Sequence, residues 1–208
     1  MKKILFIILS SFAIVTATQA ALIDYGNGMI YDDDINLTMM QDMNYVMTSG
    51  YDPDGHLTYQ EAVAWVNQLS FGGFTDWRLP SVTPCFDNNE LCPGLGELGH
   101  IYFDELGGTL WEPGLGWIQP DLSIFNNVLS GRYWAGPDFD LDDLGYSTHA
   151  WWYSLVNGSQ DSWPIDELFT EHVWAVRDGN PVPIPGTIWL FVSGLLGMLG
   201  IARLKNRA

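Results

Sequence analysis

Alternating carboxylates are the residues of this chain whose type and spacing could most directly do chemistry. Within the segment PDFDLDDLG, Asp138, Asp140 and Asp142 occupy every second position, and Asp143 follows the last of them. Carboxylate oxygens at such spacing on an irregular loop can converge on a hard cation, and Ca²⁺ is the ion that prefers them. We therefore predict a calcium site here, with a solvated acidic loop as the alternative.

A second acidic stretch, residues 50–61, partly follows the pattern of an EF-hand calcium loop. Asp52, Asp54 and Glu61 occupy positions 3, 5 and 12 of that pattern. Position 1 is Gly50, which offers no side-chain ligand, and an Asp-Gly step is also an ordinary turn. Ca²⁺ is thus the one cofactor that we predict, with Asp52 and Asp54 as a second candidate ligand pair and a simple turn as the alternative.

Trp152 is the candidate residue for stacking against a ligand. Asn157-Gly158 is a preferred pair for a tight hairpin turn, and the residues before it alternate as in a strand. Trp151 and Tyr153 then point to one face and Trp152 to the other. If that second face meets solvent, the indole can stack on a sugar ring.

Motifs of common enzymes are missing from the sequence. It contains no Ser-His-Asp order, no Gly-x-Ser-x-Gly elbow, no His-Glu-x-x-His helix and no phosphate-binding loop. We find no metal-ligand partner at ligand spacing near His100, so we interpret this histidine as structural. We predict no enzymatic activity, with a paired-carboxylate glycosidase as the alternative because the chain holds 25 acidic residues.

The loops need a rigid frame, and residues 57–81 supply its central element. One apolar stripe follows a 3.6-residue period and consists of Ala62, Trp65, Val66 and Leu69. Thr58 and Glu61 form a capping box ahead of this stripe, because each side chain can satisfy a free amide of the first turn. Gly72-Gly73 is expected to stop the helix.

The segment after this helix combines a tryptophan, an arginine and a proline. Pro80 disfavours helical geometry at Leu79, so the segment is expected to be extended. Asp76, Trp77 and Arg78 can then form a structural clasp, in which the indole is buried and the guanidinium pairs with the neighbouring carboxylate.

The predicted helix followed by GGFTDWRLPS resembles the signature of the Lcl C-terminal-domain family, a domain of unknown function. Further segments resemble motifs of the same family in the expected order, namely GMIY at 28–31, ELGH and FDELG at 97–107, YWAG at 133–136 and WAVRDG at 174–179. The resemblance implies a C-type lectin-like fold, with two helices packed on small antiparallel sheets and long loops that often carry ligand sites. Periodicity alone predicts only the α+β class. This prediction includes a β-hairpin with strands at 29–31 and 37–40, and a second helix at 97–106 with Leu98, Ile101 and Tyr102 on one face.

The first twenty residues have the composition of a secretory signal. Lys2 and Lys3 precede an apolar run at 4–15, and small residues around Ala20 suit cleavage. We predict a signal peptide at 1–20 that signal peptidase removes, with a transmembrane helix as the alternative, although the apolar run is short for a span.

The other end of the chain has three parts. Residues 181–185 form a linker, 186–202 an apolar run of transmembrane length, and 203–208 a basic tail expected to stay cytoplasmic. The sorting motif consists of Val182, Pro183, Ile184 and Pro185. This end resembles the VPLPA-like variant of the PEP-CTERM sorting signals, which implies an exosortase-type processing enzyme. It departs from the variant where Gly186 stands in place of alanine, and a plain membrane anchor is the alternative.

Charge and cysteines restrict what the body between these ends can bind. Of the 8 lysines and arginines, only Arg78, Arg132 and Arg177 lie in the body, which holds all 25 acidic residues, so its net charge is 3 − 25 = −22. Such a charge argues against nucleic acid or an anionic polysaccharide as a ligand. Cys85 and Cys92 are expected to form a disulfide that closes a short loop of the exported domain.

Together these features predict an exported domain at 21–180 that acts as a non-enzymatic binding module for exopolysaccharide or other matrix glycans. We expect it to be anchored in the inner membrane before processing and then released or displayed at the cell surface. A structural matrix or coat component without a discrete ligand is the main alternative, and a carboxylate-based, glycan-active enzyme is a further one.

Overall fold

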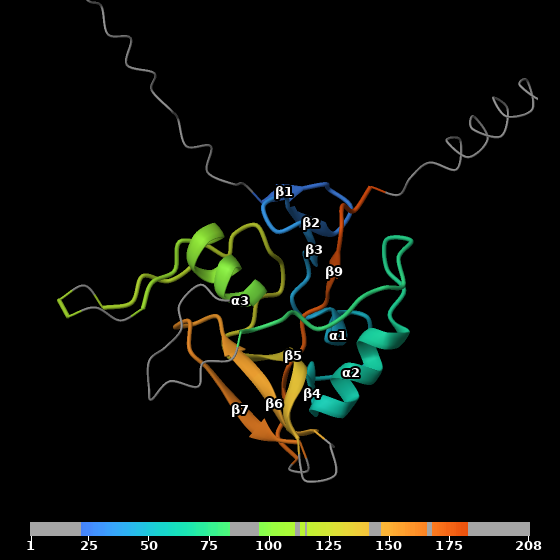
Figure 1. Ribbon diagram of the computed structural model, residues 1–208. Coiled ribbons are helices and arrows are strands. Elements are labelled where there is room, and N and C mark those ends of the chain that lie inside the picture. Colours follow the sequence, from blue (N-terminus) through green and yellow to red (C-terminus); the bar gives the residue numbers. More distant parts are fainter. Residues whose placement is uncertain are drawn as a thin grey trace, which may run out of the picture.

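The protein has an α+β architecture in the computed structural model, in agreement with the coarse prediction from periodicity (Figure 1). The structure describes residues 22–83, 96–110, 113–114, 116–141, 147–165 and 168–182. Within this part of the chain, no helix has the length and apolar character needed to cross a bilayer. The predicted signal at 1–20 and membrane segment at 186–202 lie outside the described residues.

Two sheets carry the fold. The four-stranded sheet has the order β1-β2-β3-β9, with β1 (Ile23–Asp24), β2 (Met29–Asp32), β3 (Leu37–Met40) and β9 (Val176–Asp178). The five-stranded sheet has the order β4-β8-β5-β6-β7, with β4 (His56–Leu57), β8 (Glu171–His172), β5 (Arg132–Leu141), β6 (Ser147–Ser154) and β7 (Gln160–Pro164). All pairs are antiparallel except β5 with β8.

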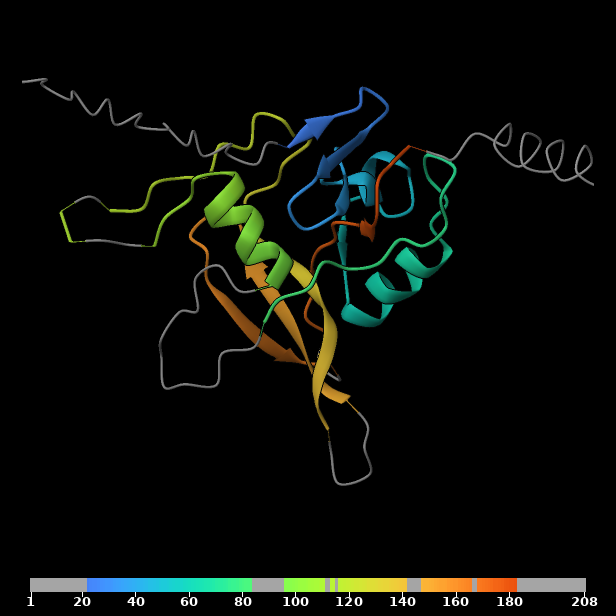
Figure 2. The ribbon, with the colours of Figure 1, turned by 45° about the horizontal axis from the view of Figure 1, so that its top comes forward.

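Helical segments flank these strands on opposite sides (Figures 1 and 2). One side carries α1 (Tyr45–Thr48) and α2 (Tyr59–Gln68), and the other carries α3 (Gly96–His100), which continues into the π-helical turn η1 (Ile101–Glu105). The predicted second helix is therefore confirmed, but its C-terminal half is wound as a π-helix, in which the Leu106 amide donates to the Ile101 carbonyl at 3.0 Å.

The four-stranded sheet joins the two ends of the domain. The predicted hairpin of β2 and β3 is confirmed, and every residue of both strands is buried. β9 pairs with β3 through Leu37 with Asp178 and Met39 with Val176. Because both faces of this hairpin are covered, Asp32, the last residue of β2, carries a carboxylate into the interior with an exposed fraction of only 1%.

Helix α2 begins as the sequence predicts and ends earlier. The capping box between Thr58 and Glu61 is present, and the apolar stripe faces the core. The prediction that Gly72-Gly73 stops the helix is wrong, because the helix already ends at Gln68. The two glycines, with φ of 61° and 85°, instead form a tight turn, since a two-residue hairpin turn of this type needs positive φ at both positions.

The core is rich in large aromatic residues, and two of its tryptophans bond to backbone carbonyls. Trp134 donates its indole N–H to the Leu57 carbonyl at 2.7 Å, and Trp174 donates to Met40 at 2.8 Å. The first bond joins β5 to β4, and the second joins the segment between β8 and β9 to β3, because buried indole groups need a partner. The predicted hairpin between β6 and β7 is confirmed, but the tight turn at Asn157-Gly158 is not, because the Ser154 amide donates to the Ser159 carbonyl at 2.8 Å and so encloses a longer loop, 155–158.

Candidate functional site

The clasp of Asp76, Trp77 and Arg78 after α2 is a structural element, but Asp76 and Arg78 form ion pairs with other residues and not with each other. The Trp77 indole is 3% exposed and donates to the Phe71 carbonyl at 3.3 Å, as expected for a buried indole. Arg78 makes a bidentate pair with Glu97, with N–O distances of 2.6 and 2.8 Å, and a further pair with Asp178. The pair with Glu97 raises the pKa of Arg78.

Asp76 does not pair with Arg78, so that part of the prediction is wrong. Its carboxylate accepts two bonds from Arg177, at 2.8 and 3.0 Å, and these bonds lower the pKa of Asp76. The reason is the antiparallel bridge between Arg78 and Val176, which aligns the two segments so that each arginine reaches a carboxylate of the other segment. The clasp therefore closes the chain rather than forming a binding site.

The acidic turn around Asp52 and Asp54 uses its carboxylates to order the backbone. One oxygen of Asp52 accepts from the amides of Asp54 and Gly55, at 3.0 and 3.1 Å. One oxygen of Asp54 accepts from the His56 amide at 2.9 Å, and this bond lowers the pKa of Asp54. These are Asx turns, so a calcium role for the pair stays a prediction that this geometry does not require.

The calcium site predicted at Asp138, Asp140 and Asp142 begins on a strand instead of an irregular loop. The backbone of Asp138 and Asp140 belongs to β5, because this segment pairs with β6 through Phe139 and His149. The expectation of an irregular loop is therefore wrong for these two residues. Asp142 and the side chains of the other two aspartates lie outside what the structure describes, as do Cys85, Cys92 and the sorting-motif residues after Val182.

Trp152 lies on the predicted face of β6, but that face is covered. The indole is only 9% exposed, because the Trp163 ring lies 5.9 Å away and the Arg132 guanidinium sits over it at 5.0 Å. Arg132 is held there by Glu171, at 2.8 Å. The exposure that sugar stacking requires is therefore absent at Trp152, and the prediction of an exposed indole is wrong.

A shallow hollow beside α2 presents an exposed aromatic ring instead. It has a volume of about 300 Å³ and is lined by Tyr45, Ser49, Gly50, Tyr51, Trp65, Gln68, Leu69 and Ser70. Tyr51 is 47% exposed, and the Gln68 amide donates to its hydroxyl at 3.4 Å. Aromatic faces beside hydroxyl and amide groups are suited to a carbohydrate ring. Sequence reasoning missed this residue, which directly precedes the acidic turn.

A larger hollow of about 420 Å³ lies between α2 and the clasp. Its charged groups already bind each other, since Arg78 pairs with Glu97 and Glu97 also accepts from the Ser81 amide at 2.8 Å. Tyr59, its aromatic lining residue, is only 6% exposed. This hollow therefore presents no exposed aromatic ring to a ligand, whereas the smaller one presents Tyr51.

A histidine and two carboxylates converge where β2 meets the helical segment α3–η1. The Nε2 atom of His100 lies 3.2 Å from an oxygen of Asp32 and 3.5 Å from an oxygen of Glu105. The side chains of Asp32 and Glu105 are 1% and 3% exposed, and that of His100 is 17% exposed. Burial raises the pKa of both carboxyl groups.

His100 was predicted to be structural and without ligand partners nearby, and this prediction missed the cluster. Asp104, four residues later, contacts Nδ1 of the ring at 3.1 Å, and that spacing was visible in the sequence. Glu105 reaches the ring because of the π-helical turn, and Asp32 arrives from a distant strand. Neither of these two contacts follows from helical periodicity.

No protein-family model, no curated protein and no solved structure matches this chain.

Proposed function

We propose that this protein is an exported, non-enzymatic module that binds neutral glycans of an extracellular matrix at the hollow beside α2. The exposed ring of Tyr51 at this hollow is the observation that carries the proposal. The apolar face of a sugar can lie on this ring, while the side-chain oxygen of Gln68 can accept from one of its hydroxyl groups. The hollow is shallow and open, which suits a chain-like ligand that extends beyond it.

The charge of the body supports a neutral ligand. Its net charge of −22 repels anionic polysaccharides and nucleic acids. The resemblance to the Lcl C-terminal domain and to a C-type lectin-like fold is consistent with a binding role, and we include both in the proposal. The two ends supply the route: a signal peptide for export, and a PEP-CTERM-like segment that anchors the domain until an exosortase-type enzyme processes it.

A polysaccharide titration with a single-residue variant tests the hollow. The full-length protein in mild detergent is titrated with a panel of soluble neutral polysaccharides while tryptophan fluorescence is followed. We expect at least one polysaccharide to bind, and Tyr51→Ala to weaken that binding about tenfold or more, since stacking of one aromatic ring contributes about 1 kcal/mol or more. Trp117→Ala is the matched control.

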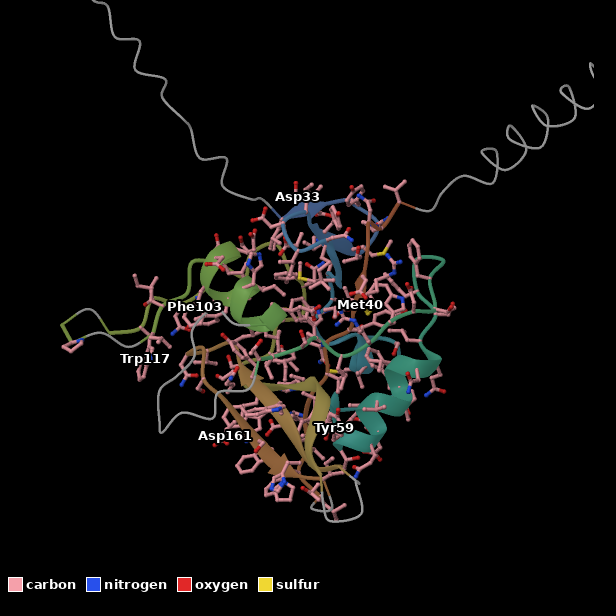
Figure 3. All side chains as sticks on the ribbon, viewed as in Figure 1. Asp33, Met40, Tyr59, Phe103, Trp117 and Asp161 are labelled. Atoms are coloured by element: carbon pink, nitrogen blue, oxygen red, sulfur yellow. The ribbon has the colours of Figure 1, made fainter. Side chains whose placement is uncertain are left out.

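Trp117 is a suitable control because it is 52% exposed and lies on a projecting loop away from α2 (Figure 3). Equal losses in both variants, or binding that Tyr51→Ala leaves intact, would contradict the hollow as the site. Absence of binding to the whole panel, together with concentration-dependent self-association in sedimentation, would favour the structural matrix role instead. Hydrolysis of a bound polysaccharide would favour the enzyme.

A further inference from the structure

The cluster of His100, Asp32 and Glu105 has the donor set and the spacing of a metal centre. The three ligand atoms all lie within 4.8 Å of one another. Ligands that surround a tetrahedral Zn²⁺ at its usual bond lengths are separated from each other by about 3.4 Å. The two distances from His100, 3.2 and 3.5 Å, match this spacing. A bound ion would lie between the three atoms without a large movement of any side chain.

Two atoms of the cluster lie within ion-pair distance of each other but make no hydrogen bond of normal geometry. Asp32 Oδ2 and His100 Nε2 are both fully buried and make no hydrogen bond to any described residue, although they lie only 3.2 Å apart. Such buried, unsatisfied atoms are rare because each costs free energy. The two atoms lie close enough for a single cation to bind both.

The surroundings of the cluster orient its ligands. The other oxygen of Asp32 accepts from the amides of Asp34 and Ile35, at 3.0 and 3.3 Å, which fixes the carboxylate. Asp104 contacts His100 Nδ1 at 3.1 Å, so a proton on Nδ1 leaves Nε2 free as a ligand. A carboxylate on the far nitrogen is the usual partner of a metal-bound histidine.

The π-helical turn η1 brings the third ligand to the same side. Residues five apart lie about 140° apart around an ordinary α-helix of 3.6 residues per turn, so Glu105 would face away from His100. With the wider π-turn, an oxygen of Glu105 instead lies 3.5 Å from His100 Nε2. Single π-turns within helices occur frequently at functional sites.

The charge balance of the body also favours a bound cation at this cluster. Its three arginines are engaged elsewhere, Arg78 with Glu97, Arg132 with Glu171 and Arg177 with Asp76. The body contains no lysine. Two buried carboxylates therefore face an imidazole without a permanent positive charge, and a divalent ion would neutralise both.

We propose that Asp32, His100 and Glu105 bind a divalent transition-metal ion that links strand β2 to the helical segment α3–η1. The imidazole ligand favours Zn²⁺ or a similar first-row ion over Ca²⁺ and Mg²⁺, which prefer oxygen ligands throughout. The site is separate from the hollow beside α2 and from both predicted calcium sites, so the proposal does not depend on glycan binding.

Calorimetry with Zn²⁺ tests the proposal on the full-length protein in mild detergent, after removal of metal with EDTA and desalting. We expect one tight equivalent of Zn²⁺. Asp32→Asn should weaken this binding about 100-fold or more, because it removes a charged ligand while its side-chain oxygen can still accept from the turn amides. Asp33→Asn is the matched control, since Asp33 is exposed and its substitution changes the net charge equally (Figure 3).

A second variant and a spectrum separate metal ligation from a purely structural ion pair. Asp104→Asn should weaken binding about tenfold and leave the ligands in place, so the visible absorption of bound Co²⁺ should keep its bands. His100→Gln should abolish those bands. Near-ultraviolet circular dichroism checks that each variant is folded.

Three results would overturn the proposal: no tight equivalent in the wild-type protein, equal loss in Asp32→Asn and Asp33→Asn, or Zn²⁺ binding that survives both Asp32→Asn and His100→Gln. The last result would place the ion elsewhere, for example at the cysteines.

Discussion

Glu97 and Glu105 lie at the two ends of the same helical segment and meet opposite electrostatic environments. Glu97 accepts two bonds from Arg78 and one from the Ser81 amide. Glu105 is buried more deeply, yet the groups around its carboxylate are Asp32, Asp34, Asp104 and the imidazole of His100. The carboxylate of Glu97 is therefore paired with an arginine, whereas that of Glu105 has no arginine beside it.

This difference follows from how few cations the body has. An acidic domain with three arginines and no lysine can neutralise only a few carboxylates, and this one uses its arginines to close the chain. Buried carboxylates without a paired cation are costly. A cluster that retains them is therefore better explained by a ligand than by stability alone.

The largest expected effect on the free energy of unfolding concerns Glu97, the carboxylate that pairs with Arg78. Glu97→Gln should lower the free energy of unfolding by about 2–3 kcal/mol, because it leaves the Arg78 guanidinium without its main partner. Urea unfolding at pH 7 measures the change. Asp178→Asn is the control, since the side chain of Asp178 is 78% exposed and its pair with Arg78 is expected to contribute less than about 1 kcal/mol. A larger loss from the control would contradict the assignment.

The next prediction concerns how stability depends on pH through a buried histidine, His172, that lies against another imidazole. The His172 ring lies 4.1 Å from that of His56, with Asp54 nearby, and burial lowers the pKa of His172 from 6.5 to about 4. The unfolded chain then binds a proton between pH 6.5 and 4 that the folded protein does not. Stability should be fully present above pH 6.5 and fall as the pH drops toward 4, by about 1–2 kcal/mol after allowance for solvent screening.

Urea midpoints at pH 7 and pH 4.5 measure this loss. His172→Gln should flatten the pH dependence, because the glutamine does not titrate. An equal slope in the variant would assign the loss to other groups.

The smallest expected effect is an increase in the free energy of unfolding, and it tests Glu105 at the other end of the helical segment. In the presence of EDTA, Glu105→Gln should raise the free energy of unfolding by about 1 kcal/mol, since it removes a buried charge next to Asp32. The same urea measurement used for Glu97→Gln gives a direct comparison. If both substitutions destabilise the protein equally, the contrast between the two carboxylates does not hold.

Local elements of this protein could be predicted because their causes lie within a few residues. The capping box of α2 needs only Thr58 and Glu61, and Asn157-Gly158 indicates the hairpin between β6 and β7, although not the length of its loop. The buried stripe of α2 follows from the helical period, and so does the apolar face of the second helix.

Only the tertiary structure decided which charges meet. Asp76 lies two residues from Arg78 in sequence, yet it pairs with Arg177, because the bridge between Arg78 and Val176 sets the alignment of the two segments. Trp152 occupies the expected face of its strand, but its burial depends on Arg132 and Trp163 from neighbouring strands.

The cluster of Asp32, His100 and Glu105 shows most clearly which contacts the sequence determined and which only the tertiary structure decided. The sequence alone determined an acidic, lysine-free body with a histidine on a short helix, and this composition already limits the cations that can neutralise buried carboxylates. It did not determine that Asp32 would lie beside that histidine or that a π-turn would bring Glu105 to its ring. Such contacts depend on long-range packing and on a local change of helical winding, and neither leaves a periodic signal in the chain.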